Sequence, residues 1–195
     1  MDKSGSNKKV GILGGTFDPP HNGHILIAEA ACAQLGLNQV LFIPSREPPH
    51  KKRPDIIDIE LRYEMVKLAL EGKPDFSVSR IEIEKSGVSY SVETLRSLKE
   101  AEPDTQFYFI VGSDAIPELK TWRNIDKIFS LCKFAVAMRP GFKSYQVPYR
   151  MIFLEGIFPD ISSSRIRQML RNGQAVEHLI GHAVCKFIKE KKLYQ

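Results

Sequence analysis

Hydrophobic positions along the chain fall into short blocks that alternate between two kinds of spacing. Lys9 to Leu13 is a short apolar run that stops at a pair of glycines, as a buried strand does. Gly23 to Leu35 carries apolar residues at helical spacing and is followed by Gly36, which suits a helix end. The same reasoning predicts further strands at 40–43, 76–83, 107–111, 134–138 and 151–154, and further helices at 59–70, 91–101, 125–131, 162–171 and 176–191.

This alternation predicts an α/β protein with a parallel sheet, helices on both faces and right-handed crossovers. Ligands of such sheets lie beyond the carboxyl ends of the strands. The candidate ligand-binding segments are therefore 14–24, 44–52, 112–114, 139–141 and 161–167. We expect residues 1–8 to be a flexible lead-in and residues 9–195 to form a single domain, with C-terminal helices from about residue 162.

Composition narrows the class of protein. A chain of 195 residues with 43% hydrophobic and 26% charged residues is ordinary for a globular protein, which excludes wholesale disorder, collagen and a coiled coil. No apolar run approaches the ~20 residues of a membrane helix, and the polar N-terminus lacks a signal core. Three widely separated cysteines indicate neither a disulfide framework nor a cysteine zinc site. We expect a cytoplasmic protein without a membrane partner.

The charge balance is mildly positive. Twenty-eight basic and 23 acidic residues give a net charge of +5, which suits an anionic ligand such as a nucleotide, a nucleic acid, or simply a solvated basic surface. The chain has no basic strands interleaved with aromatic residues and no zinc finger, so we expect no nucleic-acid partner. The oligomeric state stays undetermined, with a homo-oligomer as one option.

The segment 14–24, G-G-T-F-D-P-P-H-N-G-H, joins the first predicted strand to the first predicted helix. Gly14 and Gly15 let the backbone approach a ligand and supply N–H donors, and a helix start favours phosphate. His21 and His24 lie three residues apart, so both rings could donate to one bound phosphate group. An ordinary turn is an alternative interpretation of the same residues. A zinc site that uses His21 and His24 as ligands is another, although no third ligand stands out in the sequence. The segment is neither a Walker A loop nor G-x-G-x-x-G.

The segment 161–167, I-S-S-S-R-I-R, lies at a predicted helix start. Ser162 suits the N-cap, and Ser163 and Arg167 are four residues apart, hence on one helical face. Hydroxyls, N–H groups and a guanidinium together suit phosphate oxygens. An ordinary capped helix with surface arginines is the alternative.

Three further residues carry candidate chemistry. Trp122, the only tryptophan, belongs either to the core or to a stacking surface. Asp114 follows a buried strand and suits either a ribose or adenine donor or a helix N-cap. Lys51 lies in a proline-rich loop, where it could meet a second phosphate group or simply face solvent.

The segment 14–24 resembles the T-x-G-H-type signature of the nucleotidylyltransferase superfamily in its H-x-G-H form. More specifically, it is similar to the G-G-T-F-D-P-x-H-x-G-H of bacterial nicotinate mononucleotide adenylyltransferases. The segment 161–167 resembles that family's I-S-S-T-x-x-R, with Ser164 in place of the frequent threonine. Four shorter segments are also similar to family motifs (P-S-x-x-P-P-H-K, G-x-S-Y-T, G-[AS]-D and R-P-G), at residues 44–51, 87–91, 112–114 and 139–141.

The resemblance spans about residues 9 to 194 and implies a Rossmann-like, doubly wound fold. It also implies transfer of the adenylyl group of ATP to nicotinate mononucleotide, which gives nicotinate adenine dinucleotide and pyrophosphate in NAD biosynthesis. The catalytic residues that it implies are His21, His24 and Arg167. The implied ATP-binding residues are Gly14, Gly15, Thr16, Phe17, His24, Gly112, Asp114, Arg139, Ile161, Ser162, Ser163 and Arg167.

For the second substrate, the resemblance implies Lys51, Ser91 and Trp122, and we add Arg123 because it brings positive charge beside Trp122. We expect Mg²⁺ to be carried with ATP, because no carboxylate cluster suggests a metal site built by the protein. Three alternatives stay open: a related transferase that acts on nicotinamide mononucleotide or phosphopantetheine or uses CTP, a nucleic-acid-binding module, and a metal-dependent hydrolase that uses both histidines.

Overall fold

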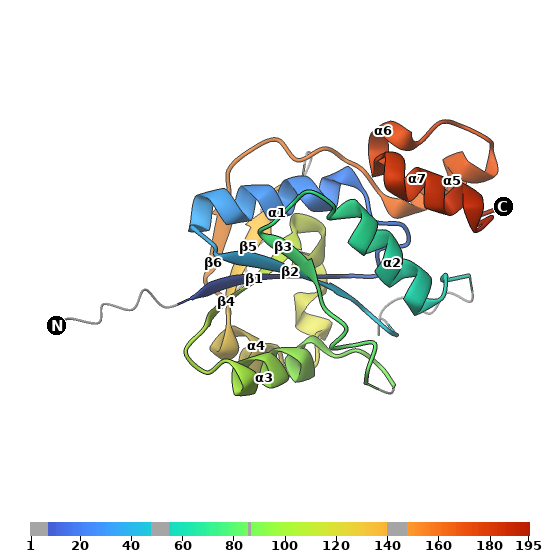
Figure 1. Cartoon of the computed structure of the whole chain (residues 1–195). Coiled ribbons are helices and arrows are strands. Elements are labelled where there is room, and N and C mark those ends of the chain that lie inside the picture. Colours follow the sequence, from blue (N-terminus) through green and yellow to red (C-terminus); the bar gives the residue numbers. More distant parts are fainter. Residues whose placement is uncertain (1–7, 48–54, 86, 140–147) are drawn as a thin grey trace.

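A computed structural model describes residues 8–47, 55–85, 87–139 and 148–195 (Figure 1). Its six strands form one sheet in the order β3-β2-β1-β4-β5-β6, and every pairing is parallel. The strands are β1 (Lys9–Gly15), β2 (Gln39–Pro44), β3 (Phe76–Val78), β4 (Gln106–Gly112), β5 (Lys133–Ala137) and β6 (Met151–Leu154). The winding direction reverses between β1 and β4, which is where doubly wound sheets bind their ligands. The predicted fold class is confirmed.

Helices cover both faces of this sheet, and further helices lie beside it (Figure 1). They are α1 (Asn22–Leu35), α2 (Ile59–Ala69), α3 (Ser91–Ala101), the 3₁₀ helix η1 (Ser113–Thr121), α4 (Ile125–Leu131), α5 (Ser163–Arg171), α6 (Glu177–Ile180) and α7 (His182–Glu190). Figure 1 shows α1 and α2 on one face and α3 and α4 on the other. In the described parts of the chain, we find no helix whose length and apolar character would let it cross a bilayer.

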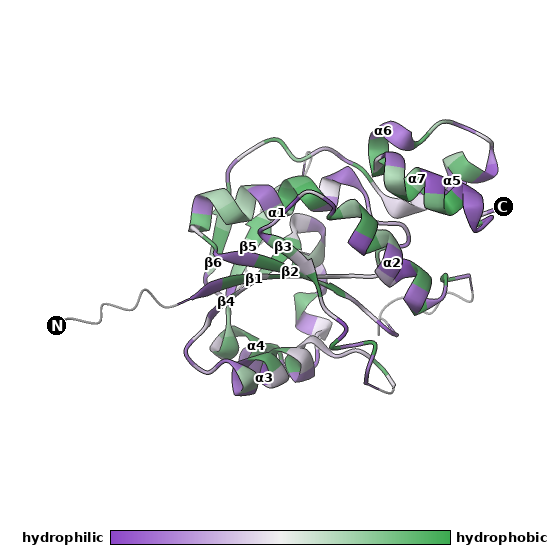
Figure 2. Cartoon of the chain, in the orientation of Figure 1, coloured by the Kyte–Doolittle hydropathy of each residue, from purple (hydrophilic) through white to green (hydrophobic). Residues whose placement is uncertain are grey.

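Each face of the sheet has its own hydrophobic core. Along β4, Tyr108 and Ile110 face the core beneath α1, whereas Phe107, Phe109 and Val111 face the core beneath α3 and α4. This alternation follows from the two-residue period of a strand, and burial on both faces accounts for the unbroken apolar run. Figure 2 shows the hydrophobic residues concentrated on the strands and on the helix surfaces that face them.

The C-terminal helices lie beside the sheet rather than over it (Figure 1). A third core cluster joins Met65 of α2 to Ile166 of α5, Ile180 of α6, Val184 of α7 and the following Tyr194. The C-terminal region thus packs against the rest of the chain in part through α2.

Two predicted elements were wrong in part, and one element was not predicted. The strand expected at 76–83 ends at Val78, because the apolar spacing lengthens from two residues to three between Val78 and Ile81, and a turn follows. The helix expected at 176–191 is divided by Gly181, whose φ of 80° is incompatible with a continuous helix. The 3₁₀ helix η1 was not predicted.

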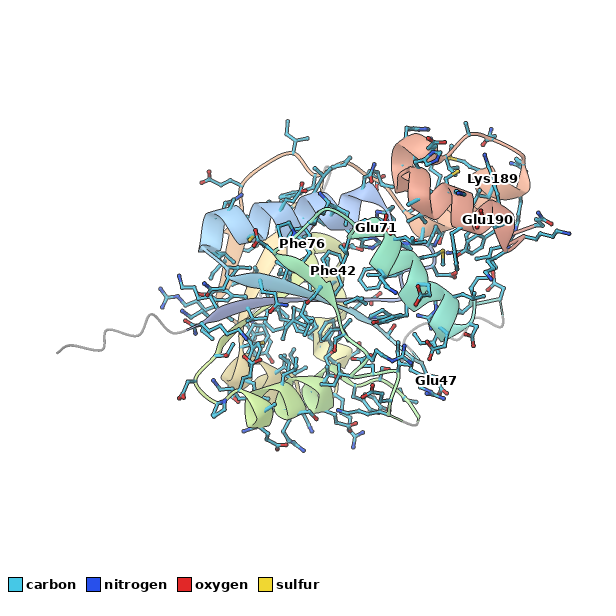
Figure 3. The ribbon with its side chains drawn as sticks, in the orientation of Figure 1. Phe42, Glu47, Glu71, Phe76, Lys189 and Glu190 are labelled. Atoms are coloured by element: carbon cyan, nitrogen blue, oxygen red, sulfur yellow. The ribbon has the colours of Figure 1, made fainter. Side chains whose placement is uncertain are left out.

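At the edge of the sheet, Phe42 of β2 and Phe76 of β3 pack with ring centroids 5.7 Å apart, and Figure 3 labels both.

Candidate active site

The segment after β1 lies at the carboxyl ends of the strands, the edge where sheets of this kind bind ligands. Gly14 is exposed, while Phe17 and Asp18 are almost fully buried. Phe17 has a φ of 50° and sends its ring into the core, where the ring edge meets His24 at a centroid distance of 4.9 Å. The Phe17 ring therefore packs against the backbone at Gly15, while Gly14 is left exposed.

The structure brings the two candidate histidines together. His21 is the N-cap of α1, and its backbone N–H donates to Nδ1 of His24 at 3.1 Å. The two rings stack with centroids 3.7 Å apart. Because Nδ1 of His24 accepts this hydrogen bond, the proton of its neutral ring lies on Nε2, which makes Nε2 the donor.

His21 is a neutral imidazole at neutral pH. Its side chain is 4% exposed, and burial, aided by the positive charge of Arg139, lowers the pKa of His21 from 6.5 to about 4. Its Nδ1 is the buried side-chain polar atom left without a hydrogen-bond partner among the described residues. Buried polar atoms are rarely left so, which marks the His21 ring as an unusual feature of this segment.

The start of α5 lies against the segment after β1. Ser162 caps α5 by accepting from the backbone N–H of Arg165. Ser163 Oγ donates to the carbonyl oxygen of Pro19 at 2.8 Å, and Nη1 of Arg167 donates to that of Asp18 at 2.7 Å. The two residues share a helical face, as their spacing indicates, and this face grips the histidine-bearing segment.

Arg167 is more buried than contact with ATP phosphates would require. It is 6% exposed, and its Nη2 donates to Ser164 Oγ at 3.2 Å, so the guanidinium is turned toward the first turn of α5. Of the implied ATP-side residues, Ile161 is half-buried immediately before that helix. The arrangement gives Arg167 a structural task in addition to any contact with phosphate.

Asp18 and Tyr194, two buried residues that sequence reasoning missed, meet on this side of the site. Asp18 Oδ1 accepts from the hydroxyl of Tyr194 at 2.8 Å, and its Oδ2 lies 3.6 Å from Nη1 of Arg167. The partners are 176 and 149 residues away in the sequence, so no local pattern pairs them. The available signal was an aspartate inside a largely apolar segment, because a buried carboxylate requires a partner.

Arg62 of α2 is a third residue that sequence reasoning missed. It is 1% exposed, and its guanidinium donates to the carbonyl oxygens of Thr16, Ser45 and Ile57 at 2.7, 2.8 and 2.8 Å. Burial lowers the pKa of Arg62. With the Thr16 carbonyl turned toward Arg62, the N–H of Phe17 in the same planar peptide points the opposite way. The signal was the position of Arg62 on the apolar stripe of α2, one turn before Met65 and Val66.

The ends of β4 and β5 contribute a second cluster. Asp114 Oδ1 lies 3.3 Å from Nε of Arg139, and the backbone N–H of Arg139 donates to Ser113 Oγ. Gly112 adjoins them, since a Cβ there would meet the Asp114 carboxylate. The predicted ATP-side residues after β4 and β5 are therefore neighbours. The rest of the R-P-G turn, residues 140–141, lies outside the described residues.

The expected second-substrate residues gather on the α3 side. Trp122 is half-buried, with its ring edge-on to Phe109 at 5.6 Å, so the core supports one part of the ring. Arg123 stacks over Tyr90 and forms an ion pair with Glu93 at 3.2 Å, so its charge is shared. Ser91 begins α3, directly after Tyr90. Lys51 lies outside the described residues.

The loop after β2 joins this group. The backbone N–H of Arg46 donates to Ser89 Oγ at 3.0 Å, and the N–H of Ser89 donates to the carbonyl oxygen of Glu47, which Figure 3 labels. Beside them, buried Glu82 accepts from Thr94 at 2.7 Å, and burial raises the pKa of Glu82. The described parts of the segments 44–51 and 87–91 are thus adjacent.

A metal site formed by the protein finds little support in this arrangement. Within the described ranges, no group of three or more histidine, cysteine, aspartate or glutamate side chains could hold a metal ion. The zinc and hydrolase interpretations of His21 and His24 therefore lack a third ligand in the part of the chain that the structure describes.

Comparison with known proteins agrees with the motifs. Residues 12–169 match the cytidylyltransferase-like family. The probable nicotinate-nucleotide adenylyltransferase of Bacillus licheniformis is 42% identical over 188 residues, which cover 96% of this chain and 99% of that protein. The nicotinate-nucleotide adenylyltransferase of Bacillus subtilis is 39% identical over the same shares of both chains.

The fold agrees as well. The structure of Plasmodium falciparum nicotinic acid mononucleotide adenylyltransferase complexed with APC matches with a TM-score of 0.80 at 21% identity, over 96% of this chain and 97% of that one. At that identity the likeness concerns the fold alone. The sequence relatives, together with the motifs after β1 and at the start of α5, show that this chain belongs to the nicotinate-nucleotide adenylyltransferase family within the cytidylyltransferase-like proteins.

Proposed function

We propose that this protein transfers the adenylyl group of ATP to nicotinate mononucleotide, which yields nicotinate adenine dinucleotide and pyrophosphate for NAD biosynthesis. The observation that carries this proposal is the meeting of two segments about 140 residues apart, which gathers His21, His24 and the first turn of α5 at the end of β1. The two Bacillus relatives described above are named for this activity, and they match this chain over nearly their full length.

The reaction needs alignment and charge stabilisation rather than a nucleophile from the protein. An oxygen of the mononucleotide 5′-phosphate bonds to the α-phosphorus of ATP, and the bond from that phosphorus to the oxygen bridging to the β-phosphate breaks. The electron pair leaves with pyrophosphate. Negative charge that grows on the α-phosphoryl and bridging oxygens is offset by donors placed in advance.

We assign those donors to specific atoms. Nε2 of His24 donates to the α-phosphoryl region, and neutral His21 donates from its own ring beside it. The backbone N–H groups at the start of α5, that of Ser163 among them, receive the leaving pyrophosphate together with the Ser162 hydroxyl. Gly14 and Gly15, with the Phe17 N–H, form the backbone floor.

The nucleoside part of ATP belongs with the cluster after β4 and β5. Asp114, exposed and beside Gly112, suits a ribose or adenine donor, and Arg139 adds positive charge near His21. On the acceptor side, Trp122 offers a ring face for stacking, and the backbone N–H at Ser91 begins a helix that favours a carboxylate. Arg123 contributes less charge than expected from sequence because Glu93 shares it.

Mg²⁺ enters this proposal with ATP. The triphosphate supplies the hard oxygen ligands that Mg²⁺ prefers, and the ion keeps several waters in such sites. The ion neutralises phosphate charge when bound.

A cytoplasmic location is also proposed, and it is supported by Cys32, Cys132 and Cys185, which are all free thiols.

The test is pyrophosphate release from ATP and Mg²⁺ with nicotinate mononucleotide, nicotinamide mononucleotide and phosphopantetheine compared side by side. We expect a strong preference for the first acceptor. Preference for another acceptor would keep the mechanism and overturn the substrate, whereas silence with all three in folded protein would overturn adenylyl transfer. His24→Ala serves as the control, with kcat expected to fall by about two orders of magnitude or more.

A further inference from the structure

The segment that carries the histidines is anchored to the C-terminal region at one short stretch, Asp18 and Pro19. Arg167 and Ser163 of α5 donate to the two carbonyl oxygens, at 2.7 and 2.8 Å. Tyr194, which follows α7, donates its hydroxyl to Oδ1 of the Asp18 carboxylate at 2.8 Å. Thus two separate parts of the C-terminal region hold this short stretch, and both contact Asp18.

Burial makes the tyrosine contact costly to lose. Asp18 is 1% exposed and Tyr194 is 7% exposed, so water is largely excluded from their hydrogen bond. A buried carboxylate needs a donor for each oxygen, and here Tyr194 serves Oδ1 while Arg167 lies 3.6 Å from Oδ2. The carboxylate is therefore fixed between a phenol and a guanidinium.

The backbone at both ends of this contact is in an uncommon conformation. Tyr194 has a φ of 64°, and Phe17, next to Asp18, has a φ of 50°. Residues other than glycine adopt this left-handed region at a cost and keep it only where surrounding contacts hold them. The Tyr194–Asp18 hydrogen bond is one of the contacts that hold both.

Displacement of Asp18 would reach the histidines directly. Only Pro19 and Pro20 separate it from His21, and the two proline rings restrict the backbone between them. We propose that Tyr194 is a positioning residue of the adenylyl-transfer site, whose hydroxyl fixes the Asp18 carboxylate against Arg167 and so sets the place of His21 and His24. This role rests on the proposed function.

The ATP side of the reaction should feel Tyr194 more than the acceptor side. Tyr194 packs in the cluster of α2 and α5 to α7, whereas Trp122 packs on the core beneath α3 and α4. Removal of the hydroxyl therefore disturbs the phosphate-facing segment and leaves the acceptor residues supported. A merely structural role would lower thermal stability without this asymmetry.

Tyr194→Phe tests the proposal in steady-state kinetics with ATP and nicotinate mononucleotide. We expect kcat/KM for ATP to fall roughly tenfold, since small misplacements of reacting groups are costly, while KM for nicotinate mononucleotide stays within about twofold. Tyr149→Phe is the matched control, because it removes a surface hydrogen bond of the same kind, to Asp126 at 3.0 Å. That control should keep wild-type constants.

A double-mutant cycle with Asp18→Asn tests the route of the effect. Because Tyr194 acts through Asp18, the double variant should be no slower than Asp18→Asn alone. Independent, multiplying losses would overturn the proposal, and so would Tyr194→Phe with a lowered melting temperature and unchanged kinetics. If Asp18→Asn does not fold, the Tyr194→Phe asymmetry decides alone. Wild-type protein inactive with both substrates would instead overturn the proposed function, and the positioning role with it.

Discussion

Gly23, between the two histidines, is a glycine because of space rather than backbone conformation. It lies in the first turn of α1, and a Cβ there would stand 3.0 Å from Nδ1 and 3.1 Å from Cε1 of His21. On its other side, Ile161 Cβ would be 3.5 Å away. The stacked arrangement of His21 and His24 therefore depends on the missing side chain.

Gly23→Ala should separate activity from stability. The new methyl group pushes the His21 ring out of its stack, so we expect kcat to fall about tenfold or more. Alanine favours a helix over glycine by roughly 0.5–1 kcal/mol, which offsets part of the crowding. Steady-state kinetics and thermal unfolding on the same preparation check both halves. Wild-type turnover would show that the ring tolerates the methyl group.

At the residue scale, the sequence predicted what is local and missed what is distant. His21, His24, Ser163 and Arg167 could be singled out as candidates because each lies in a short motif that resembles one of the family. Tyr194 gave no such signal, since its partner Asp18 is 176 residues away. Such a pair is created by the packing of α5 to α7 on α2, which no local pattern specifies.

At the element scale, α2 ties two loops of the site to one another. Its Arg62 holds the Thr16 carbonyl after β1 and the Ser45 carbonyl after β2, from a position that is 1% exposed. One guanidinium in a fixed geometry thus sets the distance between the proposed phosphate side and the loop that leads to the acceptor side.

Arg62→Met should destabilise the protein by about 2–4 kcal/mol, because four partly buried carbonyl oxygens lose their donor while the methionine fills only part of the space. Urea denaturation measures the change. Arg80→Met is the control, since it breaks an exposed ion pair with Glu60 at 2.6 Å and should shift the midpoint only slightly. Equal midpoints for the two variants would contradict the role given to Arg62.

The elements themselves were predicted where one period holds throughout. Strands buried on both faces, such as β4, and helices with a clear stripe, such as α3, agree with expectation within a residue or two. Periodicity failed where a single residue changes the path, as Gly181 does between α6 and α7. It failed also at η1, where a 3₁₀ helix containing Pro117 lacks the 3.6-residue pattern.

At the scale of the whole molecule, the phosphate side has more buried positive than negative charge. Arg62 and Arg167 are both nearly inaccessible, and Asp18 lies among them. A third cation, Arg139, acts on His21 from the end of β5. This excess suits a triphosphate, and it also disfavours a second proton on His21.

His21 should therefore contribute to a loss of stability in acid. The pKa of His21 is about 4 in the folded protein and 6.5 as its ordinary value, so between these values the unfolded chain binds the extra proton. The contribution of His21 to stability is complete above about pH 6.5 and is lost as pH falls toward 4, by at most about 3 kcal/mol. Glu82, whose pKa is raised by burial, acts with the opposite sign, so the informative quantity is the difference in pH dependence between a variant and wild type.

Urea unfolding at several pH values should show that His21→Asn loses less stability in acid than wild type does. The control His178→Asn, at an exposed position, should keep the wild-type slope of stability against pH. Identical slopes in wild type and His21→Asn would mean that His21 accepts its proton in the folded protein at an ordinary pH, and the neutral donor assigned to it in the reaction would have to be replaced by an imidazolium.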